Sequence, residues 1–599
     1  MARTKPRRWL GIDGEGIGRK PHRYVMLASA DGEVIERKSG LRTAECLDFL
    51  LSYATRDVRL CGYYLSYDWT MILKELPDGD LYTLLRPDLR ARSQDQGGGF
   101  EWIEWGGYRL HWLAHAMWIS DGIRSTVVWD LGKYYQGPFV GALRDWGIAL
   151  DVQARIAKMK DKRSTFRWGD RARIREYCLS ECRALSQLAT ALEHAHTEAG
   201  IAPRGWHGPG STAGALLSRE SIGEKRGSHP PAVLQAAQIA YVGGRAEIAC
   251  AGAIKQPVYG YDISSAYPFH ASQLPCLQHS RWYRTTSERS LEREKYAIVG
   301  GEIDRCNSDW GPLPVRLKNG SIVFPRGGAR GYWYRDEWLQ ARSWPHSRLR
   351  FDHAYVLRSE CECTPFSFIR SMFAERLRVG KNSGAGKVMK LAMNSVYGKL
   401  AQNAGTAQYQ SRIWAGMITS GTRAQVLGLM RDHKRLDHVV MVATDGVFST
   451  EERETGPIVL GGWERTDYLD GVTLVRPGIY WSGASKLRAR GLGRENLETG
   501  RDALARGILN GDEKVQLSAR TAFGGARSTV TLARDGTYRR SRYYGAWYEI
   551  PTRVSLSPGP KRTSDWSAPK LSGVQSYPYG AGKLGTLAAL LEHFDDFSQ

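Results

Sequence analysis

A cation, an amide and a phenol recur at helical spacing within residues 387–402. Lys390, Asn394 and Tyr397 lie at positions i, i+4 and i+7, which is one face of an α-helix. A cation and an amide can bind a triphosphate, and a phenol ring offers a flat surface to a base. The segment contains no proline and follows a glycine-rich turn, so we expect it to be a helix. An amphipathic surface helix with a solvated lysine would show the same pattern.

Two aspartates lie at the ends of predicted apolar strands. Asp262 is in a strand that ends in a turn enforced by Pro268, and Asp445 is in a tight Asp-Gly turn between two short apolar strands. A carboxylate in such a position is costly unless it binds something positive. One of them would be an ordinary turn residue, whereas two that flank the polar helix face indicate cation-assisted chemistry.

Four further acids come from three separate segments near the start of the chain. Asp13 and Glu15 are two residues apart on a predicted strand, so both side chains leave the same face. Asp68 follows an apolar stretch, and Glu181 lies four residues after Tyr177 in a strongly helical pattern. Four carboxylates that can converge are what two-metal hydrolysis of a phosphodiester requires. Each of them alone would be read as a surface acid.

The order of these patterns resembles the motifs of family B DNA polymerases, and most closely those of the protein-primed branch of linear-genome phages and plasmids. The matching stretches are Asp262-x2-Ser-x-Tyr-Pro, Lys390-x3-Asn-Ser-x-Tyr-Gly and Thr-Asp445-Gly, preceded by acids that are similar to the 3′–5′ exonuclease motifs. The resemblance implies an α/β multidomain fold. An RNase H-like 3′–5′ exonuclease domain would be followed by a right-hand polymerase domain with palm, fingers and thumb.

The resemblance also assigns roles around the polymerase centre. Asp262, Asp445 and the backbone carbonyl of Ile263 would hold two Mg²⁺ ions, which Mn²⁺ can replace. Tyr267 would lie beneath the sugar, where it would collide with a 2′-hydroxyl and select deoxynucleotides. The remaining nucleotide-binding residues would be Lys390, Asn394 and Tyr397. Arg378 lies on a predicted basic helix that precedes them and is a further candidate to bind phosphates, although a solvated basic face is the alternative.

At the exonuclease centre two Mg²⁺ ions would be held by Asp13, Glu15, Asp68 and Glu181, with Tyr177 beside them. Glu181 departs from the usual aspartate, and its extra methylene lengthens the reach by about 1.5 Å. Tyr64 replaces an asparagine that touches single-stranded DNA, and stacking on a base can replace that hydrogen bond.

A DNA track is predicted from two further motifs. The Tyr-x-Gly-Gly motif at residues 241–244 is similar to the family's template-binding motif, although a bulge or turn has the same pattern. Three cations at alternate positions of a predicted strand match a basic motif that contacts the primer, although a solvated strand edge is the alternative. The DNA-binding residues of this prediction, besides Tyr64, are Tyr241, Gly243, Gly244, Lys486, Arg488 and Arg490.

Ala443 departs from the family at the third polymerase motif, where Asp-Thr-Asp is usual. Asp262 and Asp445 remain, and two Mg²⁺ ions are still balanced by these two carboxylates and a triphosphate. We therefore expect a proofreading DNA polymerase that replicates a phage or plasmid-like genome. A nuclease whose polymerase half is disabled by Ala443, and a non-catalytic DNA-binding scaffold, stay open as alternatives.

The motif positions divide the chain into six parts. Residues 1–200 form the expected exonuclease domain, 201–255 a connector, 256–360 the first part of the palm with room for a priming-protein insertion, 361–435 the fingers, 436–480 the second part of the palm and 481–599 the thumb. Residues 401–410 are too few for the extended hairpin that this branch uses to displace the non-template strand, so we expect weak strand displacement.

Bulk composition limits the partners and the compartment. The 599-residue chain carries a net charge of +22 spread over its length, which indicates a polyanion such as primer-template DNA, with dNTPs as co-substrates. Its nine cysteines include no CxxC pair, so neither a zinc ribbon nor a disulfide framework is predicted. No apolar run reaches about 20 residues. We expect a monomer that acts in the cytoplasm, that of the host if the genome is viral, without a membrane partner. Three modes of initiation stay open: a separate terminal protein, a de novo start or a nucleic-acid primer.

Overall fold

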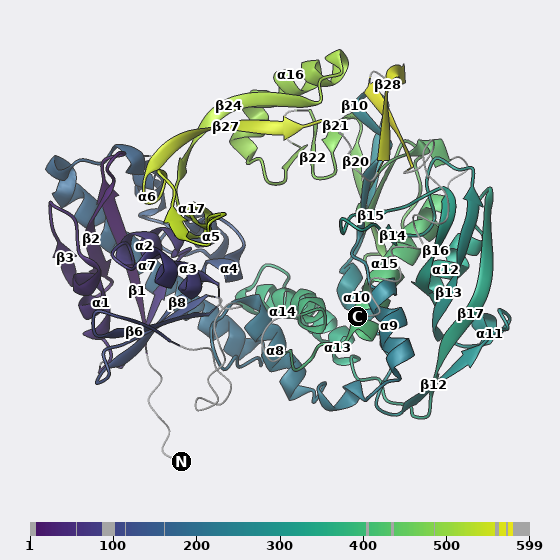
Figure 1. Cartoon of the computed structure of the whole chain (residues 1–599), viewed down its shortest axis with the longest axis horizontal. Helices are drawn as coiled ribbons and strands as arrows, with labels where there is room; N and C mark the ends of the chain where they lie inside the picture. Colours follow the sequence, from purple (N-terminus) through teal and green to yellow (C-terminus); the bar gives the residue numbers. More distant parts are fainter. Residues whose placement is uncertain are drawn as a thin grey trace. The chain divides into compact units, whose positions relative to one another are not determined.

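The computed structural model describes residues 8–55, 57–86, 102–113, 115–160, 162–402, 407–432, 436–483, 486–556, 562–570 and 573–578. The chain forms two compact units (Figure 1). The first unit consists of residues 1–216, 376–392 and 519–550, and the second of residues 217–375, 393–518 and 551–599. Among the described residues no helix is both long enough and apolar enough to cross a membrane.

An eight-stranded mixed sheet in the order β3-β2-β1-β4-β8-β7-β6-β5 is the centre of the first unit. The pairs β1–β4 and β4–β8 are parallel and the others are antiparallel. The strands are β1 (Arg8–Ile17), β2 (Arg23–Ser29), β3 (Val34–Glu36), β4 (Val58–Gly62), β5 (Ile103–Trp105), β6 (Tyr108–Leu113), β7 (Ala116–Ser120) and β8 (Ser125–Asp130). The helices around it include α1 (Thr43–Leu51), α2 (Ser66–Ile72), α3 (Asp78–Leu85), α5 (Phe139–Trp146), α6 (Gln153–Lys160) and the long α7 (Arg171–Glu198).

The packing of α7 on β1 depends on one glycine. A Cβ atom at Gly11 would lie only 2.3 Å from the carbonyl oxygen of Cys182, so a larger residue would push helix and strand apart. The close approach brings the acids of β1 next to those of α7.

Residues 519–550 group with the first unit, although the prediction counted them with the thumb. They contain α17 (Ala526–Thr529), β25 (Val530–Leu532) and β26 (Tyr538–Arg540), which pack on α2 and α3. Ala526 and Val530 are buried in the same apolar core as the eight-stranded sheet. This contact joins segments far apart in the sequence, which no local pattern reveals.

The second unit is built on three antiparallel sheets. The five-stranded sheet β20-β11-β19-β18-β9 consists of β9 (Arg245–Ile248), β11 (Val258–Ile263), β18 (Val439–Thr444), β19 (Gly446–Ser449) and β20 (Trp463–Tyr468). The four-stranded sheet consists of β12 (Ser280–Thr285), β13 (Tyr296–Cys306), β16 (Gly327–Tyr334) and β17 (Ser347–Ser359). The six-stranded sheet consists of β10 (Cys250–Ile254), β21 (Val472–Arg476), β22 (Ile479–Ser482), β23 (Lys486–Ala489), β28 (Arg562–Lys570) and β29 (Gly573–Pro578).

Helices cover these sheets and bury two apolar cores. The main ones are α9 (Pro231–Ala240), α10 (Ala266–Ala271), α12 (Arg335–Arg342), α15 (Arg412–Arg431) and α16 (Arg494–Asn510). Helices α13 (Phe368–Val379) and α14 (Gly384–Leu400) precede α15 in the chain. The helix predicted over residues 387–402 is thus confirmed as α14.

Candidate active sites

Three carboxylates of the first unit converge where β1 meets α7. Donor oxygens of Asp13, Glu15 and Glu181 all lie within 4.8 Å of one another. The two β1 acids share a face, as their spacing predicts. Glu181 reaches them from α7 despite its departure from the usual aspartate.

Asp68 lies close to this group without being part of it. Its buried carboxylate accepts a hydrogen bond from the hydroxyl of Tyr24 (3.0 Å), and its charge contributes to the raised pKa of Asp13. Three of the four predicted acids therefore have donor oxygens close to one another, and the charge of the fourth acts on Asp13.

Two cations that the sequence analysis left unassigned complete the cluster. Arg163 places Nη2 at 2.7 Å from Glu15 Oε1, 2.6 Å from Glu181 Oε2 and 3.4 Å from Asp13 Oδ2. Lys160 Nζ lies 2.6 Å from Glu181 Oε1. Both belong to the basic run 158–163, which is a candidate source of a lysine for this centre but is also typical of a solvated face, so the sequence alone assigns neither residue.

The pKa values indicate that negative charge remains in excess. Burial raises the pKa of Asp13, that of Glu15 to about 7 and that of Asp68 to about 6. Burial acts in the same direction on Glu181, but Arg163 and Lys160 outweigh it and lower its pKa to about 2. The buried carboxylates carry more negative charge than Arg163 and Lys160 neutralise, and their oxygens are hard donors. Both features fit a divalent cation such as Mg²⁺.

Two predicted site tyrosines belong to the same unit as this acidic centre. The hydroxyl of Tyr177 is buried and has no hydrogen-bond partner among the described residues, and the guanidinium of Arg163 lies 5.6 Å from its ring centre. Tyr64 is exposed and has a left-handed φ of 53°. Its N–H donates to Asp130 Oδ1 (2.8 Å), which fixes the loop that presents the ring at the surface.

A second acidic centre lies on the five-stranded sheet of the second unit. Asp262 near the end of β11 pairs with Gly446 of β19, and Ile263 N–H donates to the carbonyl of Asp445 (2.9 Å). The Asp262 side chain is exposed at the surface. Partial desolvation by the surrounding protein raises its pKa to about 6, and the negative charge of Asp445 acts in the same direction. Burial also raises the pKa of Asp445. The two aspartates predicted to work together are therefore neighbours.

The turn that carries Asp445 differs from the predicted Asp-Gly turn by one residue. Ala443 pairs with Gly446, so Thr444 and Asp445 form the two-residue loop and the glycine begins β19. Thr444 has a left-handed φ of 63°, which this type of turn demands and which glycine or asparagine more often supplies. A Cβ at Gly446 would lie 2.3 Å from Asp262 Oδ1, so this glycine instead makes room for the neighbouring acid.

Tyrosines from three predicted motifs meet in this unit. The hydroxyls of Tyr241 and Tyr397 are 2.8 Å apart, and the ring centres of Tyr397 and Tyr267 are 4.7 Å apart. Gly244 passes against the Asp445 turn, since a Cβ there would lie 2.5 Å from Thr444 Cγ2. Gly243 has open space on its side-chain side.

The Tyr-x-Gly-Gly loop is supported by a buried ion pair that the sequence analysis missed. Arg423 of α15 forms two bonds with Glu337 of α12, Nε–Oε1 at 2.7 Å and Nη2–Oε2 at 2.8 Å. Its Nη1 donates to the carbonyls of Val242 (2.7 Å) and Gly243 (2.8 Å). An arginine within a helical pattern gives no sign of such a contact.

The predicted polar face of α14 is accessible. Lys390 and Asn394 are exposed and Tyr397 is half-buried. Lys390 and Arg378 belong to residues 376–392 of the first unit, so their contact with a triphosphate at the second acidic centre stays a prediction.

The three cations after β22 lie on or next to an edge strand. Lys486 and Arg488 belong to β23, Arg490 follows it, and all three are exposed. Arg488 is close enough to Asp262 to lower its pKa. A basic edge next to an acidic centre fits the predicted contact with primer phosphates better than an isolated solvated edge does.

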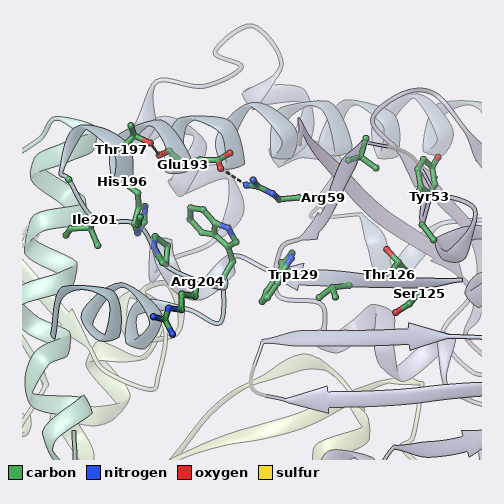
Figure 2. A pocket seen from close by; sticks show the side chains of 17 residues that line it. Tyr53, Arg59, Ser125, Thr126, Trp129, Glu193, His196, Thr197, Ile201 and Arg204 are labelled. Atoms are coloured by element: carbon green, nitrogen blue, oxygen red, sulfur yellow. Dashed lines mark hydrogen bonds and ion pairs between the residues drawn. The ribbon is translucent and has the colours of Figure 1, made fainter. Parts of the chain in front are cut away.

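A separate cavity of about 580 Å³ lies in the first unit between the sheet and the end of α7. Figure 2 shows Arg59 and Glu193 pointing toward each other in its lining, and the two side chains form an ion pair. The lining contains none of the predicted site residues.

Comparisons with known proteins agree with this arrangement. Residues 233–412 match the family "DNA polymerase type B, organellar and viral". No curated protein sequence matches the chain. Phi29 DNA polymerase has the same fold.

The complex of phi29 DNA polymerase with primer-template DNA and incoming nucleotide covers 92% of this chain and 100% of its own, with 12% identity and a TM-score of 0.57. Its binary complex with primer-template DNA has the same coverage, 11% identity and a TM-score of 0.58. The match to its complex with single-stranded DNA covers 96% of this chain and 99% of the phi29 chain, with 11% identity and a TM-score of 0.53. The matches confirm the predicted resemblance to type B DNA polymerases over residues 233–412, and they confirm that the chain has the fold of phi29 DNA polymerase.

Proposed function

We propose that this chain is a type B DNA polymerase that adds deoxynucleotides to a primer at the Asp262–Asp445 centre and removes 3′-terminal nucleotides at the Asp13–Glu15–Glu181 centre. The observation that carries the proposal is the adjacency of Asp262 and Asp445 on neighbouring segments of one sheet. The family match includes the first of these two aspartates.

Mg²⁺ is the cofactor that the donor set favours, with Mn²⁺ as a substitute. Carboxylate and carbonyl oxygens are hard ligands that suit these ions. The ligands would be Asp262, Asp445 and the carbonyl of Ile263 at one centre, and Asp13, Glu15, Asp68 and Glu181 at the other. When bound, two divalent ions lower the pKa of the attacking hydroxyl or water and neutralise charge on the phosphate.

The protein's own groups position the substrates. Tyr267, packed against Tyr397, would form the floor beneath the deoxyribose and exclude a 2′-hydroxyl. Asn394 and Tyr397 would line the nascent base pair, while Lys390 and Arg378 would bind the triphosphate.

DNA would be held by groups at both centres. Tyr241 and the open backbone at Gly243 would contact the template, and the basic residues 486, 488 and 490 would contact primer phosphates. Near the exonuclease centre, Tyr64 would stack on a base. The unpartnered hydroxyl of Tyr177 would orient the attacking water.

The partners of this activity would be primer-template DNA and dNTPs, in the cytoplasm of the cell or viral host. Phi29 DNA polymerase binds primer-template DNA and incoming nucleotides in its solved complexes, which supports this substrate class. A terminal protein, if it primes synthesis, would be a separate chain. Labelled dNTP becoming covalently attached to a candidate partner protein on incubation with the enzyme and template would identify it.

The test is primer extension with Mg²⁺ on a labelled primer-template. The wild type should lengthen the primer with dNTPs and shorten it without them. Asp262→Asn should lower extension at least about 100-fold, because it removes a metal ligand that supports charge stabilisation, and should retain shortening. The double variant Asp13→Asn/Glu15→Gln should lose shortening and retain extension. Asp352→Asn, which changes a surface acid of the second unit, is the matched control and should retain both.

The same assay separates the alternatives that Ala443 leaves open. Shortening without extension by the wild type would mean a nuclease with a disabled polymerase half. A shifted DNA band without either reaction would mean a scaffold. Extension that survives Asp262→Asn would contradict the assignment of this centre.

A further inference from the structure

Three cysteines and a histidine of the second unit form a cluster that neither acidic centre uses. The donor atoms of Cys276, His279, Cys361 and Cys363 all lie within 4.8 Å of one another. His279 Nδ1 is 3.7 Å from Cys276 Sγ and 3.6 Å from Cys363 Sγ. Cys276 is fully buried, and the other three lie at or near the surface.

The four side chains meet because two strands bring their segments together. Cys276 and His279 come just before β12, whereas Cys361 and Cys363 come just after β17. These strands are antiparallel, with Ser280 opposite Ser359, so the start of one lies beside the end of the other. Beyond that pair, Glu360 N–H donates to the carbonyl of His279 (2.9 Å). The backbone therefore holds both halves of the cluster in place.

The spacing of the donors matches one metal geometry. Zinc binds sulfur at about 2.3 Å and histidine nitrogen at about 2.05 Å, so a tetrahedral site separates the two donors by about 3.6 Å. The two sulfur–nitrogen distances agree with this value. A thiol–imidazole hydrogen bond would need only one cysteine, and a disulfide would not need the histidine. Four soft and borderline donors around one point are what zinc requires.

We infer that these four residues bind one Zn²⁺ ion as a structural Cys₃His site. Four protein ligands leave no open coordination position, which is typical of structural rather than catalytic zinc. The ion would join the segment that follows α10 to the segment that leads into α13. Pro275, next to the first ligand, accepts a hydrogen bond from Trp414 Nε1 of α15 (2.9 Å), so the ion would also stabilise the packing of α15.

The sequence predicts no zinc ribbon because it contains no CxxC pair. The ligands here are Cys-x2-His and Cys-x-Cys, and they lie far apart in the chain. Only the pairing of β12 with β17 makes them neighbours.

The test is the metal content of the full-length protein, purified without an affinity tag that binds metals. The wild type should carry about one zinc ion per chain that is retained through gel filtration in metal-free buffer, because closed sites of this type bind tightly. Cys361→Ser and Cys363→Ser should each reduce the bound zinc at least tenfold. Glu362→Gln, between the two ligands, and Cys250→Ala, a buried thiol of the same unit, should keep it.

Cobalt binding provides a second measurement. It uses only the wild type, so it does not depend on whether the cysteine variants fold. Reconstitution of chelator-stripped wild type with Co²⁺ should give intense tetrahedral d–d bands and thiolate-to-cobalt charge transfer. Wild-type protein that holds less than about 0.1 zinc per chain after reduction and incubation with Zn²⁺ would overturn the inference. Zinc retained in full by Cys361→Ser, or a disulfide within the cluster found by mass spectrometry of the freshly purified protein, would also overturn it.

Discussion

His270 is a histidine held neutral by its surroundings. Its Nε2 lies 3.1 Å from Gln425 Oε1 of α15, and its ring packs so closely on Gly421 that a Cβ there would lie 2.5 Å from Nδ1. Burial lowers the pKa of His270 from 6.5 to about 4, although the hydrogen bond to Gln425 opposes the shift. The contact between α10 and α15 therefore depends on an uncharged imidazole.

We predict that this histidine makes the second unit sensitive to acid. Below pH 6.5 His270 binds a proton in the unfolded chain but not in the native state. The free energy of unfolding therefore decreases as the pH falls from about 6.5 to about 4. The loss attributable to His270 should reach up to about 3 kcal/mol. Urea unfolding followed at pH 7.5, 5 and 4 should show a smaller loss in His270→Gln than in the wild type.

His194→Gln, which removes an exposed histidine of α7, is the control and should follow the wild type. Equal pH dependence in His270→Gln and the wild type would contradict the role of His270.

Helix α15 connects the parts of the second unit through the buried Arg423–Glu337 pair. Both side chains are almost fully buried, at 2% and 1% exposure, and the guanidinium also binds the loop carbonyls before Gly244. Such a pair is weak evidence for stability by itself, but removing one partner leaves an uncompensated buried charge.

We expect Arg423→Met to destabilise the second unit by about 3–5 kcal/mol, because Glu337 then stays buried without a partner. The double variant Arg423→Met/Glu337→Leu should recover part of this loss, because it removes both charges. Thermal unfolding and template binding would be measured together, since the same arginine holds the Tyr-x-Gly-Gly loop. Arg431→Met, at the end of the same helix, should change neither. A single variant as stable as the wild type would refute the role of the pair.

Elements with a strong local signal could be predicted from the sequence, and contacts between distant segments could not. The helix at Lys390, the strand at Asp262 and the hairpin at Asp445 follow from periodicity and turn chemistry. Arg163, Arg423 and the cysteine–histidine cluster depend on partners from other parts of the fold. The one-residue error at the hairpin arose because Asp-Gly is a strong turn signal, whereas here Gly446 is needed beside Asp262.

At the scale of the whole molecule, strand displacement depends on a short connection. Helix α14 ends at Leu400 and α15 begins at Arg412, which leaves only residues 401–411 between them. Residues 403–406 lie outside the described part of the chain. The prediction of weak displacement therefore depends on the length of the connection, not on its conformation.

We predict that the enzyme stalls when it meets a long downstream duplex. A labelled primer extended across a gap should give products that end near the blocking strand, because residues 401–411 are too few for an extended hairpin that would separate the two strands. The same template without the blocking strand should be copied to its end. Smooth copying through the duplex would refute the prediction.

The contact between Gly244 and Thr444 links two loops that are far apart in the sequence. Because a Cβ at Gly244 would occupy the space of the Thr444 methyl group, residue 244 cannot gain a side chain while residue 444 keeps its size. A lineage that acquires alanine at 244 would have to shorten residue 444 to regain the position of the neighbouring acid. In related sequences, a residue larger than glycine at 244 should therefore occur together with a residue smaller than threonine at 444.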